Sequence, residues 1–257
     1  MTNLRRSFAV AAAVVAGLAA QVAPASAIVG GQQAAVGQFR SVVSIVAAGW
    51  QGDEHKCSGV LLGTRSVLTT AGCVDGHTAG DLKVKYDGTD RTTLRTTNNV
   101  TKVDQHAEYD PSTGRRNVAV LVLADPILTS DTVDTAELPL PVLNDPAPGS
   151  RVHLAGWGKT QRGNAGLPTQ LQHADLPVIS RAACNTAYGA GSITTGMFCA
   201  KAQVAKFACE GDAGSPVLVG NRVVGLVTAK NGCTHPGKPD VYVRTGAFEL
   251  WILSHVR

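Results

Sequence analysis

Six cysteines constrain the fold of this 257-residue chain more than any other feature, because all of them follow an N-terminal segment with the pattern of an export signal. An even number of cysteines in an exported chain favours disulfides over metal or redox sites, and no C-x-x-C motif occurs. Six cysteines allow 15 pairings. Sequential pairing is our working choice, because the successive spacings are 16, 15 and 24 residues in Cys57, Cys73, Cys184, Cys199, Cys209 and Cys233.

The export signal is predicted at residues 1–27. Arg5 and Arg6 precede a 13-residue apolar or glycine stretch that starts at Phe8, and Ala25-Ser26-Ala27 forms the cleavage site. A membrane anchor would need about 18 apolar residues or more. We therefore expect a secreted, extracellular protein that does not associate with a membrane and whose mature chain begins at Ile28. The pattern leaves open whether the general or the twin-arginine route exports it.

The composition is that of a globular domain, with 44% hydrophobic and only 16% charged residues. This excludes a disordered chain and a coiled coil. The formal charge of +4 is spread without runs of Lys and Arg, so no nucleic-acid partner is expected. No P-loop, dinucleotide-binding glycine motif, H-E-x-x-H or EF-hand loop occurs, so we expect neither a cofactor nor a metal.

Short apolar or alternating runs between turn residues predict an all-β fold. They cover residues 41–46, 59–62, 82–86, 118–123, 152–155 and 217–227. Gly220-Asn221 interrupts the last run and suits a two-residue hairpin turn. Short helices are predicted after an N-cap at Ser180 and at the end of the chain around Trp251. The proline-rich stretch 138–149 has the composition of a linker between two halves, about 28–138 and 139–257.

Five motifs resemble, in order, the landmarks of trypsin-like serine proteases. They are Ile28-Val29-Gly30-Gly31, V-L-T-T-A-G-C at 67–73, N-V-A-V-L at 117–121, A-G-W-G at 155–158 and C-E-G-D-A-G-S-P at 209–216. The resemblance covers essentially residues 28–257. It implies two packed six-stranded antiparallel β-barrels with a short C-terminal helix, and disulfides Cys57–Cys73, Cys184–Cys199 and Cys209–Cys233.

The same resemblance implies that the catalytic groups are missing. Acyl transfer in this family needs a serine, a histidine that takes its proton and a carboxylate that orients the histidine. The three matching positions hold Ala213, Gly72 and Asn117. The backbone amides of Gly211 and Ala213 correspond to the oxyanion hole. We therefore expect a catalytically inactive homologue, a pseudoprotease.

Two other residues are candidate substitutes for the missing groups. His77 follows Gly72 by five residues, in what the family makes a surface loop, and Ser215 takes the position of a packed glycine two residues after Ala213. We expect a solvated histidine and a buried packing serine. The alternative is an active extracellular endopeptidase with a displaced triad.

The specificity pocket implied by the resemblance is altered too. Phe207 stands at its base where trypsins have an aspartate, and Thr228-Ala229-Lys230 replaces the S-W-G wall. Asp240 replaces a pocket glycine. Lys230 and Asp240 either pair across a filled pocket or are two solvated charges at its rim, where such a pair contributes little.

Asp212 is retained although it performs no chemistry. In the family this carboxylate forms a buried ion pair with the new N-terminal amine, here Ile28. A buried carboxylate without its partner costs about 3–5 kcal/mol, so we expect the pair to form after signal cleavage.

An ordered scaffold without catalytic groups indicates a binding protein. The expected partner is another protein: a protease, a protease inhibitor or a host hydrolase. A carbohydrate-binding surface is a weaker alternative, because only 5% of the residues are aromatic. Asn99 lies in an N-x-T sequon and is a glycosylation site if the source modifies such sequons.

Overall fold

The computed structural model describes residues 28–49, 52–94, 96–139, 146–163, 166–202, 207–228, 233–234 and 237–257. The predicted export signal, residues 140–145 of the proline-rich linker, Ala229 and Lys230 therefore lie outside the described residues. Within the described part, no helix is long and apolar enough to cross a membrane.

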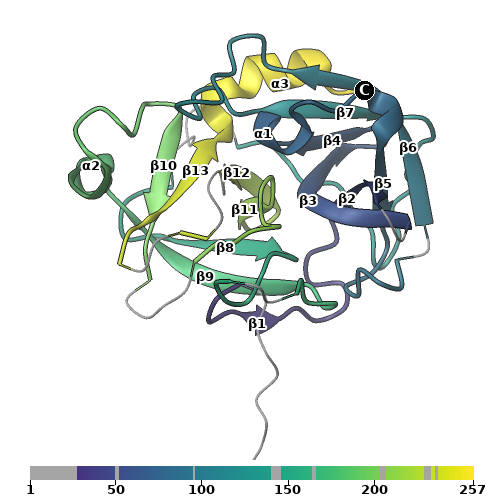
Figure 1. Cartoon of the computed structure of the whole chain (residues 1–257), viewed down its shortest axis with the longest axis horizontal. Helices are drawn as coiled ribbons and strands as arrows, with labels where there is room; N and C mark the ends of the chain where they lie inside the picture. Colours follow the sequence, from purple (N-terminus) through teal and green to yellow (C-terminus); the bar gives the residue numbers. More distant parts are fainter. Residues whose placement is uncertain are drawn as a thin grey trace, which may run out of the picture.

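The strands form two closed, six-stranded antiparallel β-barrels that lie side by side (Figure 1). Strands of the first barrel follow the ring order β2-β3-β4-β7-β6-β5. They are β2 (Val42–Gly49), β3 (Gly52–Gly63), β4 (Ser66–Thr69), β5 (Leu82–Tyr86), β6 (Thr96–Gln105) and β7 (Ala119–Leu123). The predicted fold class is confirmed.

In the second barrel the ring order is β9-β10-β13-β12-β11-β8, and β8 pairs with β9 to close it. Its strands are β8 (Arg151–Gly156), β9 (Gln172–Ile179), β10 (Met197–Ala200), β11 (Pro216–Val219), β12 (Arg222–Val227) and β13 (Asp240–Arg244). Val219 pairs with Arg222 across the predicted Gly220-Asn221 turn, and Gly220 has the positive φ of 59° that this turn requires.

The apolar runs of the sequence match β2, β3, β5, β7, β8 and the β11–β12 hairpin, whereas β4, β6, β9, β10 and β13 were missed. Strand β9 shows why, because its buried residues alternate with partly exposed ones and the first of them is a glutamine, Gln172. A barrel strand needs apolar side chains only on its inward face. Polar and small residues therefore hide such strands from a search for apolar runs.

Each barrel has its own apolar core, and a third cluster joins the two. Val43, Ile45 and Leu121 belong to the first core, and Leu154 and Tyr242 to the second. The joining cluster contains residues from β3, β4 and β7 of the first barrel and from β11, β12 and β13 of the second. The two barrels therefore form one packed body, and their interface can carry a site.

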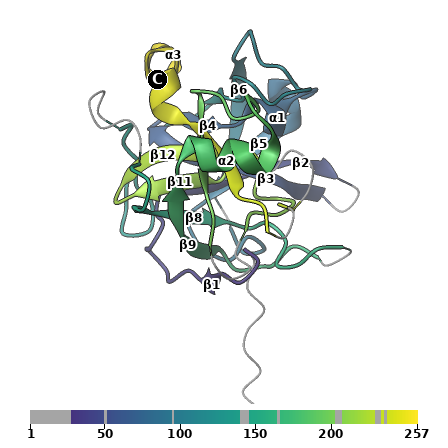
Figure 2. The same cartoon turned by 90° about the vertical axis from the view of Figure 1, so that its left-hand side faces the viewer.

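The N-terminal segment precedes the first barrel but pairs with the second, and the C-terminal helix packs between the two barrels. Strand β1 (Gln32–Gln33) pairs with β9, so the N-terminal segment belongs to the second barrel. Helix α3 (Glu249–His255) follows the 3-10 helix η3 (Thr245–Phe248) and packs through Ile252 in the joining cluster beside β7. Figure 2 shows β1 and α3 at opposite ends of the molecule.

Helix α2 (Arg181–Tyr188) begins after Ser180, whose Oγ accepts a hydrogen bond from Ala183 N at 3.1 Å. The predicted N-cap is thus confirmed. The three sequential disulfides are confirmed as well: Cys57–Cys73, Cys184–Cys199 and Cys209–Cys233.

Candidate functional site

Gly72 and Asn117 meet at the edge of the first barrel. Gly72 lies in helix α1 (Ala71–Val74), directly after β4, and Asn117 lies just before β7. Gly72 N donates a hydrogen bond of 2.7 Å to Asn117 Oδ1. Asn117 is buried while Gly72 is exposed. The fold therefore brings two of the three expected positions into contact, and neither side chain can ionise.

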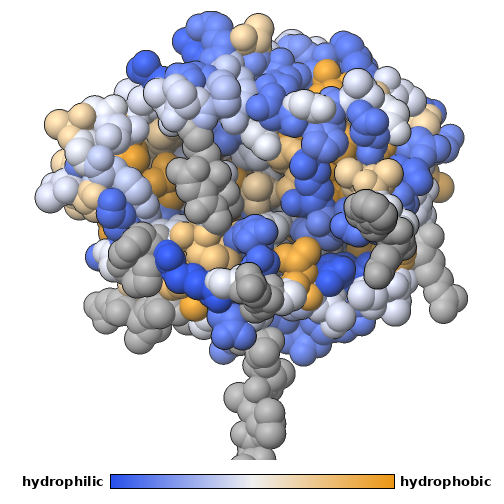
Figure 3. All heavy atoms as spheres, in the orientation of Figure 1, coloured by the Kyte–Doolittle hydropathy of each residue, from blue (hydrophilic) through white to orange (hydrophobic). Residues whose placement is uncertain are grey.

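Ala213 is held against the first barrel from the second. Its carbonyl oxygen accepts a hydrogen bond from Ser58 N in β3 at 2.9 Å. Its methyl group packs on the first core, to which Cys57 and Cys73 belong. In Figure 3, apolar atoms lie near the centre of the face, where Figure 1 places the junction of the barrels, and the rim is mainly hydrophilic.

Tyr109 takes up the space beside Gly72. A Cβ atom placed on Gly72 would lie 2.8 Å from Tyr109 Oη, closer than real Cβ contacts allow. Burial raises the pKa of Tyr109 above its usual value, and the negative charges of Asp75 and Asp110 add to this. The hydroxyl is therefore a hydrogen-bond donor at neutral pH. Sequence reasoning missed Tyr109, and no sequence signal points to it, because the contact depends on the path of the 106–116 loop.

The backbone amides of Gly211 and Ala213 remain available. Among the described residues, neither N–H donates a hydrogen bond to the protein. Gly211 has a φ of 94°, and a Cβ there would lie 2.7 Å from Leu167 Cδ2, so the turn needs a glycine. Gly211 and Ala213 are both partly exposed residues of this turn.

His55 supports this turn from below and was also missed in the sequence. His55 Nε2 donates to Gly211 O at 3.1 Å, and its Nδ1 accepts from Ser44 Oγ at 2.8 Å. These roles fit the neutral ring. Burial lowers the pKa of His55 to about 4, against the raising effect of the Gly211 contact.

Asp212 is fully buried behind the turn. Its carboxylate accepts hydrogen bonds from Gly158 N at 2.8 Å and Cys209 N at 2.9 Å. Burial raises the pKa of Asp212 to about 7 although both N–H donors lower it. Ile28 is also fully buried, in the second core, and the neighbouring Val29 forms a β-bridge with Phe207. The ion pair between the Ile28 amine and Asp212 stays a prediction.

At the predicted specificity pocket, Asp240 is not at the rim. It is only 3% exposed, and it accepts hydrogen bonds from Ala208 N and from Tyr242 Oη at 3.2 Å. Thr234 provides a third contact, and burial raises the pKa of Asp240 to about 6. The solvated-rim interpretation of Asp240 is wrong, because β13 directs this side chain into the protein. The pairing with Lys230 lies outside the described residues.

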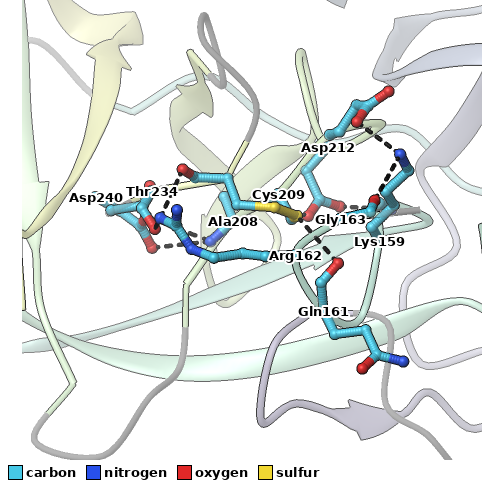
Figure 4. The surroundings of a disulfide bond; sticks show 12 residues. Lys159, Gln161, Arg162, Gly163, Ala208, Cys209, Asp212, Thr234 and Asp240 are labelled. Atoms are coloured by element: carbon cyan, nitrogen blue, oxygen red, sulfur yellow. Dashed lines mark hydrogen bonds and ion pairs between the residues drawn. A yellow bond between two sulfur atoms is a disulfide. The ribbon is translucent and has the colours of Figure 1, made fainter. Parts of the chain in front are cut away.

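Phe207 and Thr228 occupy the other described pocket positions. Phe207 is 8% exposed, and the guanidinium carbon of Arg162 lies 5.7 Å from its ring centroid. Arg162 also donates to the carbonyl oxygens of Cys233 and Thr234, beside the Cys209–Cys233 disulfide (Figure 4). Thr228 Oγ1 donates to Val241 O at 2.9 Å. Sequence reasoning missed Arg162.

Within the described part of the chain, the two substitute residues form no hydrogen bond to Gly72, Asn117 or Ala213, although Ser215 N donates to Asp212 O at 2.9 Å. His77 Nδ1 contacts Asp75 O in its own turn at 3.0 Å. Ser215 is fully buried, and its Oγ has no hydrogen-bond partner within the described part of the chain. Asn99 is exposed on β6, as its proposed modification requires. No group of three His, Cys, Asp or Glu side chains among the described residues could hold a metal ion.

Comparison with known proteins identifies the family. The family model described as Trypsin matches residues 28–252. Trypsin Blo t 3 of Blomia tropicalis is 34% identical over 230 residues, which are 88% of this chain and 84% of that protein. Trypsin alpha-4 of Lucilia cuprina is 31% identical over 96% of this chain and 94% of its own length. Trypsin beta of Drosophila erecta is 30% identical over 89% of this chain and 88% of its own. The chain therefore belongs to the trypsin-like serine protease family.

Proposed function

We propose that this family member is a secreted pseudoprotease that acts by binding another protein non-covalently. The bound protein is a protease, a protease inhibitor or a host hydrolase, and binding either blocks that protein or draws it away from an active relative. The relatives are named trypsins; the proposal is that this chain has kept their fold and lost their chemistry.

The observation that carries the proposal is the chemical identity of the residues at the three positions that match the catalytic groups of the family. Gly72 and Asn117 are hydrogen-bonded to each other at 2.7 Å, and Ala213 faces the same barrel. A hydrogen atom, a neutral amide and a methyl group provide neither a base nor a nucleophile. Losing triad members in this type of enzyme leaves only about a thousandfold to ten-thousandfold rate enhancement over water.

The state of the scaffold supports binding over simple decay. Asp212 keeps two hydrogen bonds in a fully buried position, and the Gly211 turn retains its two free N–H donors. A chain that had merely lost function would not need these costly buried groups. The Gly211 turn can therefore still offer its N–H donors to a peptide loop of a partner.

The competing function is an active endopeptidase with a displaced triad. His77 contacts its own turn, and among the described residues the enclosed Ser215 Oγ has no hydrogen-bond partner. A nucleophile and its base must lie within hydrogen-bond reach, about 2.6–3.2 Å. The alternative would therefore need both residues to rearrange.

A labelling experiment tests the loss of catalysis. The secreted, disulfide-bonded protein is incubated with a fluorophosphonate probe and with a library of fluorogenic peptides, with bovine trypsin as positive control. We expect no covalent label and no turnover. Labelling that is abolished by Ser215→Ala or His77→Ala would overturn the proposal in favour of the displaced triad.

A competition experiment tests the binding role. Trypsin is inhibited with a protein inhibitor of the canonical-loop type, and the purified chain is added in excess. If the chain binds such inhibitors, trypsin activity returns in proportion to the chain added. To test the blocking role, the chain is titrated directly into secreted proteases and hydrolases without the inhibitor, and the loss of their activity is measured. Failure of every arm at micromolar concentrations would refute the proposed binding role.

A further inference from the structure

A surface pocket of about 530 Å³ lies between the loop after β6 and the start of α3, apart from the cleft residues described above. We name it the α3 pocket. Its walls include the rings of His106, Phe248 and Trp251, with Arg116, Glu249 and Leu250 around them. The volume falls within the range of about 300–1,000 Å³ typical of ligand sites. Neither the resemblance nor the proposed function assigns it a role.

The aromatic walls of the α3 pocket are fixed by their neighbours. The His106 ring lies 5.7 Å from Phe248 and 5.2 Å from Trp251 between centroids, and Trp251 stacks on His255 at 4.3 Å. Burial lowers the pKa of His106, and the charge of Arg116 lowers it further, while Glu108 opposes this shift. The His106 ring is therefore uncharged at neutral pH and suits an apolar occupant.

Exposed leucines extend this apolar surface beyond the pocket. Leu250 is 84% exposed and Leu253 is 54% exposed. They are three residues apart on α3, so they share one face of the helix. Such apolar surface outside the pocket favours a polypeptide over a small molecule as the occupant.

Arg116 lines the pocket, and Arg115 precedes it in the chain. The turn before them is held by Asp110, which accepts hydrogen bonds from the backbone and hydroxyl groups of Ser112 and Thr113. Arg115 is exposed and forms no ion pair within the described part of the chain. Arg116 pairs with Glu108 at 3.2 Å, but both side chains are exposed, so this pair is weak and can be exchanged.

We propose that the α3 pocket binds a peptide segment of a partner protein that carries one aromatic side chain next to a run of carboxylates. The aromatic ring enters between Phe248 and Trp251, and the carboxylates meet Arg115 and Arg116. Glu249 repels acidic groups on its side of the pocket, which sets the direction of the segment. The proposal stands independently of whether the cleft is inactive.

Fluorescence anisotropy on the full disulfide-bonded protein tests this proposal. The probe is a fluorescein-labelled peptide in which one phenylalanine precedes three acidic residues. One control peptide has serine in place of phenylalanine, and another has the acids replaced by their amides. We expect the parent peptide to bind more tightly than both controls by about tenfold or more, and its affinity to fall with added salt.

Matched variants locate the site. Leu250→Ser and the pair Arg115→Ser with Arg116→Asn should each weaken binding by about tenfold; asparagine is chosen because residue 116 has a φ of 53°, which it tolerates. Leu128→Ser and Arg151→Ser are exposed controls away from the pocket and should leave binding unchanged. Circular dichroism confirms that each variant is folded.

Three results would overturn the proposal. They are equal binding of the three peptides, equal losses in the pocket and control variants, and no binding at all. Sedimentation provides a fourth: a dimer that Leu250→Ser dissociates would make this face a contact between copies of the chain. None of these variants alters Gly72, Asn117, Ala213 or their neighbours. A negative peptide-binding result would therefore leave the labelling and competition results unaffected.

Discussion

Asn117 and Gly72 form a hydrogen bond although neither residue carries an ionisable group. Asn117 Oδ1 accepts from Gly72 N at 2.7 Å, a contact that a carboxylate at this position would make equally well. The space next to Gly72 is taken by the hydroxyl group of Tyr109. Introducing the catalytic residues that the resemblance implies would therefore add a side chain at Gly72, where the Tyr109 hydroxyl already occupies the space.

We expect the triple variant Gly72→His, Asn117→Asp and Ala213→Ser to hydrolyse an arginine ester slowly at best. The new imidazole must displace Tyr109, and the buried Phe207 leaves a basic substrate without a counter-charge at the predicted pocket base. Contacts in the pocket orient the substrate in the transition state, so their loss lowers turnover as well as affinity. Stopped-flow or steady-state ester hydrolysis measures the effect.

The control for this prediction compares Phe207→Asp with Phe207→Ser in the triple variant. Both remove the ring, but only aspartate adds a charge, so only aspartate should raise kcat/KM for arginine over a neutral ester. Rapid, arginine-selective turnover by the triple variant alone would contradict our interpretation of the pocket.

His55 predicts a loss of stability in acid. In the unfolded chain a histidine titrates near 6.5, whereas in the folded protein the pKa of His55 is about 4. Between these values the unfolded state binds more protons, so lowering the pH through this window favours unfolding by about 3 kcal/mol at most. Urea unfolding of the parent and His55→Gln between pH 7.5 and pH 4 measures the difference.

The comparison with His55→Gln is needed because two buried carboxylates act in the opposite direction. Burial raises the pKa of Asp212 to about 7 and that of Asp240 to about 6. Each group's contribution to the stability of the folded protein is therefore lost as the pH rises through these values. Both contributions are common to the parent and the variant. If the two proteins lose stability in parallel on acidification, the assignment to His55 is wrong.

At the scale of elements, most helices and strands are set by what they pack on. The sequences of helix α1 and strand β6 show little of the pattern of a helix or a strand. Helix α1 follows directly on β4, and β6 forms by pairing with β7. Helix α2 differs, because only Cys184 of its eight residues is buried. Its stability therefore depends on its cap and on the Cys184–Cys199 disulfide more than on packing.

We expect Ser180→Ala to destabilise the protein by about 1 kcal/mol, because it leaves Ala183 N without the hydrogen bond that Ser180 Oγ accepts at 3.1 Å. Ser180→Asp, which can also cap a helix, should restore most of the loss. Chemical unfolding of both variants checks this. Equal destabilisation by alanine and aspartate would show that the cap is not the cause.

At the scale of the whole molecule, both ends of the chain connect the two barrels. Strand β1 joins the second barrel and α3 packs in the cluster between them. Processing at Ile28 would therefore act on the core of one barrel, and it is the event on which the predicted ion pair with Asp212 depends.

We expect the secreted protein to begin at Ile28 and to lack six hydrogens relative to the reduced chain, as intact mass and N-terminal sequencing will show. A start at Ile28 should also be more stable than a start at an added Ala27, by about 3–5 kcal/mol, because only the free amine can pair with buried Asp212.

The matched test repeats that comparison in Asp212→Asn, where the two starts should be nearly equal in stability. A gap of the same size in Asp212→Asn would show that the N-terminus contributes through packing alone. Any free thiol in the mature protein would contradict the three-disulfide framework.

Several features could be predicted from the sequence because they depend on local chemistry or on ordered motifs. The cysteine spacing, the Gly220-Asn221 turn and the Ser180 cap all follow from residues close together in the chain, and the structure confirms them. Strands such as β6 and β10 were missed, because a barrel strand is stabilised by partners far away in sequence rather than by its own pattern.

The sequence alone determined the family resemblance, the all-β fold, the disulfides and the chemical identity of Gly72, Asn117 and Ala213. Only the tertiary structure decided which side chains fill the space around them. Tyr109 beside Gly72, His55 beneath Gly211 and the burial of Asp240 all join segments far apart along the chain. Such contacts follow from how closed barrels pack, and packing depends on every neighbour at once, which no single stretch of sequence encodes.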